Sequence, residues 1–363
     1  MKKIKKFIES PGVFFRDYFN KKYPKIYNEV SCPQEEEEII IRHGLVLDDK
    51  LNGSFPIDIV FTWVNGNDPE WIKKYKKFKS INIESHGQHA TNQARFSDHN
   101  ELYYSISSII KYLPWVEKIY LITDSQIPSW IKEFQIVKII DHTEIIPKEY
   151  LPTFNSHVIE AHLHKIPNLA EHFIYFNDDV FVARPLPKGH FFKSNGLASL
   201  FLSDKSYQNM VANGIITPTL SASLKVSLML SEILGFRIDT PLVHTYIPLR
   251  KSMFDLVEKI YAEEIASFLP NKFRTNEDLN VATCLVPWYS YAQGYSTPER
   301  DICYYFNIRS PVAKNIYKSL YHRPFKHSPH SFCANDVVQN TQSEGDYVSK
   351  LKKALNYYYY FKK

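Results

Sequence analysis

Residues 172–179 read HFIYFNDD, and this stretch decides the predicted fold. The segment from His172 to Phe176 is dominated by aromatic and β-branched residues, which favour a buried strand. Asn177 and two adjacent carboxylates, Asp178 and Asp179, follow directly. The stretch therefore predicts an apolar strand that delivers an acidic turn to its carboxyl end.

Similar apolar runs lie on the amino-terminal side of this stretch. Residues 56–64 (PIDIVFTWV) are rich in β-forming residues and are bounded by Pro56 and by an Asn-Gly turn. Residues 117–123 (EKIYLIT) and 135–140 (QIVKII) have the same character. We therefore expect four strands in the first half of the chain.

Helical patterns separate these strands. Ser97 precedes one helix, with Asp98 and Glu101 expected in its first turn, and a second helix is expected over about 156–165. Strands that alternate with helices predict an α/β fold with a mainly parallel sheet flanked by helices. Further apolar periodicity adds a helical subregion, at residues 226–236 and 252–269.

The composition is that of a folded protein with a sizeable core. The chain has 363 residues, 44% hydrophobic and 23% charged, with a formal net charge of +5. This charge is too small and too scattered for a nucleic-acid enzyme. The aromatic content of 15% suits carbohydrate binding, because sugar C–H faces pack on flat rings, but it suits core filling equally.

The compartment is predicted from the cysteines and from the apolar segments. The four cysteines form no CxxC pair and no compact disulfide framework, which favours a reducing cytoplasm. No run of about 18 apolar residues predicts a transmembrane helix, and the basic N-terminus lacks the apolar region of a signal peptide. We expect a cytoplasmic protein with peripheral membrane contact.

The sequence divides into three segments. Residues 1–50 are expected to be an appendage, residues 51–340 the main domain, and residues 341–363 a C-terminal helical tail. In the appendage, lysines alternate with apolar residues that could rest on an anionic membrane surface: Ile4, Phe7, Ile8, Phe14 and Phe15. The alternative, given equal weight, is a helix packed on the main domain.

Polar clusters follow three of the predicted strands. They are residues 63–68 (WVNGND), residues 123–125 (TDS) and residues 177–179 (NDD). Parallel α/β sheets bind ligands beyond the carboxyl ends of their strands, so these clusters are expected to lie together. The acidic pair in the third cluster suits Mg²⁺ or Mn²⁺, which prefer oxygen ligands. The alternative is that both aspartates only cap a turn.

Cationic and imidazole side chains provide a second set of candidates. Phosphate chemistry needs positive charge near the leaving group, and four arginines are candidates: Arg95, Arg274, Arg309 and Arg323. A single arginine is more often a solvated surface residue. His244 lies between apolar residues and could act as a general base, although a hydrogen-bonded core histidine is the commoner case.

Four blocks of the sequence resemble the signature regions of the Stealth proteins. DIVFTWVNGNDPEW (58–71) resembles the first region, and the second is matched by residues 94–130 and 151–181. Residues 243–280, which include VHTYIPLRKSMFDLV and KFRTNEDLN, are similar to the third, and HSFCAND (330–336) is more loosely similar to the fourth. The blocks occur in the family's order. This family includes bacterial capsule polymerases and the animal enzyme that adds N-acetylglucosamine-1-phosphate to lysosomal proteins.

The resemblance implies a fold similar to nucleotide-sugar (GT-A-like) glycosyltransferases. It also implies metal-dependent transfer of a hexose 1-phosphate from a UDP- or GDP-sugar to a sugar hydroxyl, with release of a nucleoside monophosphate. The acceptor would be an oligosaccharide or a lipid-linked polysaccharide, other capsule-synthesis proteins are expected partners, and no nucleic acid is expected. The main domain, residues 51–340, would then be catalytic.

By motif position, the resemblance also implies site residues. The expected catalytic residues are Asp179, His244 and Arg274, with Mg²⁺ or Mn²⁺ held by Asp178, Asp179 and Asp336. The expected substrate-binding residues are Asn65, Asp68, Arg95, Asp98, Glu101 and Asn177. Two alternatives stay open: a conventional glycosyltransferase that releases a nucleoside diphosphate, and a non-catalytic polysaccharide-binding protein.

Overall fold

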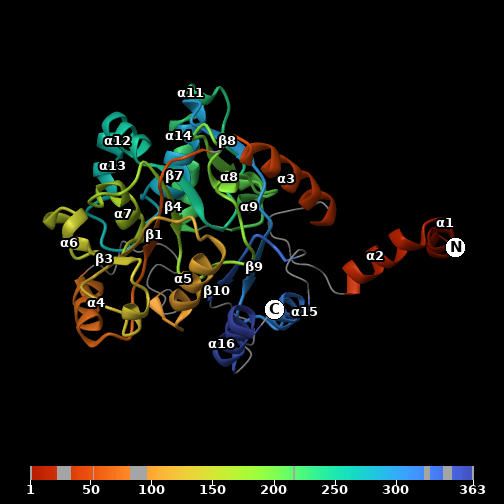
Figure 1. Cartoon of the computed structure of the whole chain (residues 1–363). Helices are drawn as coiled ribbons and strands as arrows, with labels where there is room; N and C mark the ends of the chain where they lie inside the picture. The colour runs from red at the N-terminus through yellow and green to blue at the C-terminus, as the bar shows by residue number, and fades with distance from the viewer. Residues whose placement is uncertain are drawn as a thin grey trace.

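The structure of the protein is a computed structural model, shown in Figure 1. It describes residues 2–22, 34–51, 53–81, 96–215, 217–322, 328–337 and 346–361. Two of the candidate arginines, Arg95 and Arg323, lie outside the described residues.

The central sheet has the strand order β3-β2-β1-β4-β7. Its strands are β1 (Ile57–Thr62), β2 (Ile119–Thr123), β3 (Val137–Asp141), β4 (His172–Phe176) and β7 (Ile247–Arg250). The first four are parallel, and β7 pairs antiparallel with β4. The predicted α/β fold with a mainly parallel sheet is confirmed.

Helices cover both faces of this sheet (Figure 1). On one face, Phe61 of β1 belongs to the same apolar cluster as Ile106 of α5 (Glu101–Tyr112). On the other face, Val60 shares a cluster with Phe254 of α12 (Lys251–Ile260). Residues of β1, β2 and β4 are buried on both faces, which explains their continuous apolar sequences.

Further helices and single turns surround the sheet. They include α4 (Pro69–Ile81), α6 (His142–Ile145), α7 (Ser156–Glu160), α13 (Ala262–Phe268), α14 (Val286–Ala292) and α15 (Ala313–His322). Single turns lie at Ile131–Glu133, Lys148–Tyr150, Leu163–Lys165 and Val281–Leu285. The helix expected over 156–165 is therefore α7 followed by a separate 3₁₀ turn.

Two smaller sheets complete the architecture. One pairs β10 (Ser331–Asn335) with β5 (Val180–Val182) and β9 (Cys303–Asn307), and the other pairs β6 (Ala198–Phe201) with β8 (Ser296–Glu299). In the first, Cys333 of β10 lies opposite Val180, the residue after Asp179. This pairing brings the C-terminal part of the chain to the acidic turn.

The expected helical subregion is present as separate helices. Residues 226–236 include the end of α10 (Pro218–Met229) and all of α11 (Ser231–Leu234), and residues 252–269 fall mainly in α12 and α13. Two further helices, α8 (Lys188–Phe191) and α9 (Tyr207–Ala212), lie outside the expected ranges. Thr217 caps α10 by accepting from Leu220 N–H, and Pro218 occupies the first turn, where its missing N–H costs nothing.

The C-terminal segment contributes to the main core. It contains α16 (Tyr347–Asn356) and a final turn (Tyr357–Phe361). The Tyr358 hydroxyl donates to the Ala183 carbonyl oxygen, and the Tyr359 hydroxyl donates to that of Val182 at 2.8 Å. Both rings are buried, so these residues anchor the strand that follows the acidic turn.

The N-terminal segment contains α1 (Lys2–Glu9), α2 (Pro11–Lys22) and α3 (Gln34–Asp49). Helix α3 packs on the main domain, where Ser194 N–H and Oγ donate to Asp48 Oδ1 at 3.3 and 3.2 Å. Figure 1 shows α1 and α2 apart from the rest of the molecule. The division of the chain at residues 50 and 340 stays a prediction.

Candidate active site

The acidic turn joins β4 to β5 at the carboxyl edge of the central sheet. Asp179 Oδ2 accepts from Asn335 Nδ2 at 2.9 Å and from the Cys333 thiol at 3.3 Å. Asp179 Oδ1 is buried and has no hydrogen-bond partner among the described residues. Hydrogen bonds thus fix one carboxylate oxygen of Asp179, while the other oxygen has no hydrogen-bond donor among the described residues.

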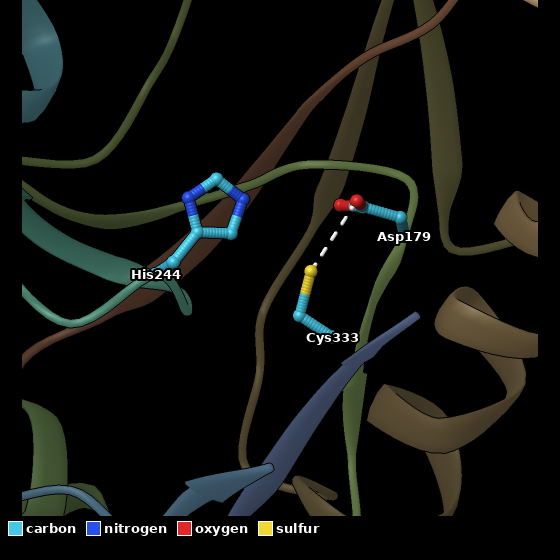
Figure 2. A group of neighbouring side chains, drawn as sticks. All are labelled: Asp179, His244 and Cys333. Carbon is cyan, nitrogen blue, oxygen red and sulfur yellow. Dashed lines mark hydrogen bonds between the residues drawn. The ribbon is translucent and has the colours of Figure 1, made fainter. Parts of the chain in front are cut away.

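His244 faces this carboxylate from the segment before β7. Figure 2 shows the His244 imidazole, the Asp179 carboxylate and the Cys333 thiol grouped together. One ligand atom of each lies within 4.8 Å of the others. The imidazole is exposed and lies edge to face on Tyr305, with ring centroids 5.1 Å apart. An exposed imidazole beside a fixed carboxylate can accept a proton from a bound hydroxyl.

Cys333 enters this group as a neutral thiol. Burial, and then the neighbouring Asp179 carboxylate, raise the pKa of Cys333 well above its usual value. The thiol therefore donates a hydrogen bond to Asp179 at neutral pH and does not compete with it as an anionic ligand.

Three more carboxylates crowd around the same turn. Burial, followed by the charges of Asp179 and Asp98, raises the pKa of Asp178 to about 8. Burial, followed by Asp178 and Asp98, raises the pKa of Glu101 well above its usual value. Each carboxylate thus lies in the electrostatic field of the others.

Backbone geometry places Asp98 and Glu101 at this position. Asn100 adopts the left-handed conformation (φ 71°) that Asn tolerates, and its N–H donates to Asp98 Oδ1 at 2.8 Å. The helix begins at Glu101, so Asp98 precedes the first turn in which it was expected. Gly66 N–H donates to the Phe96 carbonyl oxygen at 2.7 Å, and a Cβ at Gly66 would collide with that oxygen.

This arrangement fits a divalent cation. Buried, crowded carboxylates with an unsatisfied oxygen on Asp179 are costly unless positive charge offsets them. Asp178 and Asp179 offer the oxygen ligands that Mg²⁺ and Mn²⁺ prefer. The described site residues are therefore compatible with a bound divalent cation, as expected, without identifying which metal it is.

Asp336 lies near this region but has other partners. Its oxygens accept from Arg309 Nε, from Arg309 Nη2 at 3.0 Å, and from His99 Nε2 at 3.0 Å. Burial alone would raise the pKa of Asp336, but the hydrogen bonds from His99 and Arg309 hold it below its usual value. The structure does not group Asp336 with the ligand atoms of Asp179 and His244.

Arg274 lies in a second polar group at the ends of β1 and β4. Its guanidinium donates to Ser156 Oγ through Nε at 3.1 Å and also through Nη2. Tyr175 is a buried residue of β4, and its hydroxyl lies in the electrostatic fields of Glu160, Arg274 and Asp178. The group of Arg274 therefore adjoins the acidic turn.

Tyr175 connects this second group to Asn177. The Tyr175 hydroxyl contacts Thr62 Oγ1 at 2.9 Å, Asn177 Oδ1 at 3.1 Å and Glu160 Oε1 at 3.5 Å. Glu160 is a buried carboxylate at the end of α7. Glu160 was not among the residues predicted from the sequence, although a glutamate within a short, otherwise apolar helical segment is a signal of a buried polar role.

A buried carboxylate fixes the loop that carries Arg274. Asp278 accepts from Asn155 Nδ2 at 2.9 Å, His157 Nδ1 at 3.0 Å and Asn271 Nδ2 at 2.8 Å. Burial would raise the pKa of Asp278, but the hydrogen bonds from His157, Asn271 and Asn155 hold it below its usual value. Asp278 thereby orients the loop that carries Arg274.

The first polar cluster mainly shapes its own loop. Asn65 Oδ1 accepts from Asn67 N–H at 3.0 Å, and the Asn65 backbone exchanges two hydrogen bonds with the Gln126 side chain. Asp68 Oδ1 accepts from Trp71 N–H at 2.8 Å and so caps α4. The substrate contacts expected for Asn65 and Asp68 stay predictions.

A third group of titratable residues lies deeper. His190 Nε2, His330 Nδ1 and the Tyr246 hydroxyl surround Asp301 Oδ1 at 2.8, 3.0 and 2.8 Å. Two ligands of one tetrahedral zinc, each about 2.0–2.1 Å from the metal, lie about 3.3 Å apart. The separations around Asp301 Oδ1 are shorter than this and are those of hydrogen bonds. The group therefore stabilises the segment that carries Tyr246 and His244, and it does not have the geometry of a zinc site.

Fold and site together define an α/β enzyme whose candidate active site lies at the carboxyl edge of a mainly parallel sheet. Residues 55–82 match the family model for Stealth protein CR1, conserved region 1, and residues 95–200 match that for CR2, conserved region 2. The chain belongs to the Stealth family of capsular polysaccharide phosphotransferases, and the resemblance noted in the sequence is confirmed.

Two relatives carry this assignment. The chain is 58% identical to the capsular polysaccharide phosphotransferase LcbA of Aeromonas hydrophila, over 97% of this chain and 98% of the relative. It is 54% identical to that of Neisseria meningitidis, over 99% of this chain and 100% of the relative. Among solved structures, the galactosyltransferase LgtC with donor and acceptor sugar analogs matches 82% of this chain and 95% of its own, at 10% identity and a TM-score of 0.41.

Proposed function

We propose that the protein transfers a sugar 1-phosphate from a UDP- or GDP-sugar to a hydroxyl of a capsular polysaccharide acceptor. A nucleoside monophosphate leaves, and a sugar–phosphate–sugar diester remains. The observation that carries this proposal is the exposed His244 imidazole beside the Asp179 carboxylate, at the acidic edge of the sheet. The two relatives, which are named capsular polysaccharide phosphotransferases, support the same reaction class.

His244 and Arg274 have separate tasks in the proposed reaction. His244 accepts the proton of the acceptor hydroxyl as that oxygen forms its bond to the phosphorus next to the donor sugar. The bond between this phosphorus and the oxygen bridging to the nucleotide breaks, and the bridging oxygen leaves with the nucleoside monophosphate. Arg274, oriented by Ser156, donates to the phosphoryl oxygens, where negative charge is concentrated.

The carboxylates of the acidic turn hold the cofactor in this proposal. Asp178 and Asp179, with Asp98 beside them, would bind Mg²⁺ or Mn²⁺, and the ion would supply positive charge to the pyrophosphate. Asp336 could join them only by releasing Arg309. Asn335 keeps the Asp179 carboxylate in one orientation.

The acceptor is proposed to be a growing oligosaccharide or a lipid-linked polysaccharide at the inner face of the cytoplasmic membrane. Other capsule-synthesis proteins would then act on the same polymer. None of the helices within the described ranges combines the length and the apolar composition needed to cross a bilayer.

The released nucleotide tests the proposal. Purified protein is incubated with Mg²⁺, UDP- or GDP-sugars and short capsule oligosaccharides, with His244→Gln as the matched variant. UMP or GMP, formed by the wild type and strongly reduced in the variant, is expected. UDP or GDP, formed with a product that lacks phosphorus, would show a conventional glycosyltransferase instead.

A further inference from the structure

The N-terminal arm, residues 2–22 with helices α1 and α2, concentrates the positive charge of the protein. Residues 1–22 contain seven lysines and arginines and two acidic residues, a net charge of +5. The whole chain also has a net charge of +5, so residues 23–363 are neutral overall. A partner that attracts this protein by charge would therefore bind the arm.

The arm also exposes large apolar side chains. In α1, Ile4, Phe7 and Ile8 follow the three-to-four spacing of one helix face and are 66%, 43% and 71% exposed. In α2, Phe15 and Phe19 are also about half exposed. The lysines of α1 occupy the intervening sequence positions 2, 3, 5 and 6.

Aromatic contacts hold α1 and α2 against each other. The ring of Phe7 lies 5.1 Å from that of Phe14 and 5.7 Å from that of Phe15, in edge-to-face geometry. Phe15 in turn stacks on Phe19 at 6.3 Å. Among the residues that the structure describes, the arm is thus a helical pair whose apolar surface is not covered by the main domain, whereas α3 packs on α8 (Figure 1).

We propose that the N-terminal arm docks on the surface of an anionic phospholipid membrane. Lysines and arginines meet the lipid phosphates, and the aromatic and aliphatic side chains enter the boundary between headgroups and acyl chains. A second copy of the arm is a poor alternative occupant, because two arms of charge +5 repel each other. An anionic lipid surface can pair with the positive charge of the arm and can also bury its exposed apolar side chains.

This inference deepens the proposed function, because a lipid-linked acceptor lies at such a surface. Docking through the arm leaves the carboxyl edge of the central sheet free, since neither α1 nor α2 supplies a residue to the site. The inference does not need the proposed reaction: vesicle binding and sugar-phosphate transfer are measured separately.

Co-sedimentation of the full chain with vesicles tests the inference. One set of vesicles contains only phosphatidylcholine, and the other also contains phosphatidylglycerol. We expect at least about tenfold stronger binding to the second set, weakening as salt is added, since each basic residue near such a surface contributes about a fivefold factor. Equal binding to both sets, or none to either, would overturn the inference.

Matched variants locate the binding surface. Phe15→Ser with Phe19→Ser should reduce vesicle binding about tenfold or more, and Lys5→Glu with Lys6→Glu should do the same through charge. The control is Leu228→Ser, which replaces an equally exposed apolar residue outside the arm. Arm variants that bind like the wild type would overturn the inference.

Activity toward a soluble donor and a short acceptor separates this inference from the proposed function. The arm variants should keep wild-type turnover on these substrates, because their substitutions lie outside the site. A protein that binds anionic vesicles through the arm but releases no nucleoside monophosphate would refute the proposed reaction and support the membrane inference.

Discussion

Replacing Asp179 by Asn separates the chemical role of the carboxylate from its structural role. The Asn side chain has the same shape, and its oxygen can accept from Asn335 and Cys333 as Asp179 Oδ2 does. The substitution removes the negative charge at Oδ1, the buried oxygen that has no partner among the described residues. The fold should therefore persist while cation binding is lost.

Activity and stability should change in opposite directions. Removing a preorganised electrostatic group from an active site typically lowers kcat about 10²–10³-fold. In metal-free protein, Asp179→Asn also removes one charge from a crowded acidic group, which should raise the free energy of unfolding by about 1–4 kcal/mol, the range for like charges about 4 Å apart at intermediate dielectric. Mg²⁺ should stabilise the wild type in a thermal unfolding assay and should leave the variant nearly unchanged.

The control is Asp58→Asn, at the other end of β1. Asp58 is also a buried carboxylate, and it accepts from Ala170 N–H at 2.8 Å. This variant should keep the Mg²⁺ response and the activity of the wild type. Wild-type kcat in Asp179→Asn, together with an unchanged Mg²⁺ shift in unfolding temperature, would refute the metal assignment.

Three further outcomes follow from other paired or buried side chains. Arg274→Lys keeps the charge but loses the planar pair of donors to Ser156, so kcat/KM should fall about 10–100-fold in steady-state assays, with the fold intact. Asp301→Ala removes the acceptor oxygens, leaves buried donors such as the Tyr246 hydroxyl unpaired and should lower the free energy of unfolding in urea by about 3–5 kcal/mol. Burial lowers the pKa of His164 to about 4, below its usual value of 6.5. The buried neutral imidazole therefore contributes fully to the free energy of unfolding above pH 6.5. This contribution, up to about 3 kcal/mol, is lost as the pH falls toward 4. Wild-type protein should therefore lose more stability than His164→Gln across this range in urea titrations. Equal losses would contradict this assignment.

Local sequence patterns were sufficient to predict the four parallel strands of the central sheet but not its antiparallel edge strand β7. The apolar run 172–176 coincides with β4, and the acidic residues after it lie at the carboxyl edge as expected. The predicted strand 135–140 is β3, shifted by one or two residues to Val137–Asp141. Buried parallel strands have continuous apolar sequences, and such runs are visible without any tertiary information.

Partners across long sequence distances could not be predicted in the same way. Asn335 and Cys333 reach Asp179 because β10 pairs with β5 across about 150 residues, a pairing that no local period records. Similarly, the sequence placed Asp336 near the site but could not show that Arg309 and His99 occupy its oxygens. Such occupancy depends on side-chain geometry rather than on motif spacing.

Two features of the sequence were each compatible with two different structural roles. Asp68 precedes Pro69 at the start of a helical pattern, which is typical of a helix cap as well as of a ligand-binding turn. The basic and aromatic N-terminal residues fitted both a membrane surface and a packed helix. In the structure, α3 is packed on the main domain and α1 and α2 lie apart from it, and the membrane contact of α1 and α2 stays a proposal.

The fate of one oxygen atom tests the central claim most directly. The donor is synthesised with a heavy oxygen isotope between the sugar C1 carbon and its phosphorus, and the products are analysed by mass spectrometry. Transfer of the sugar 1-phosphate leaves this C–O bond intact, so the account predicts the label in the diester of the polysaccharide and none in the nucleotide. Label recovered in a released nucleoside diphosphate would mean that the sugar–oxygen bond breaks, and would contradict the account.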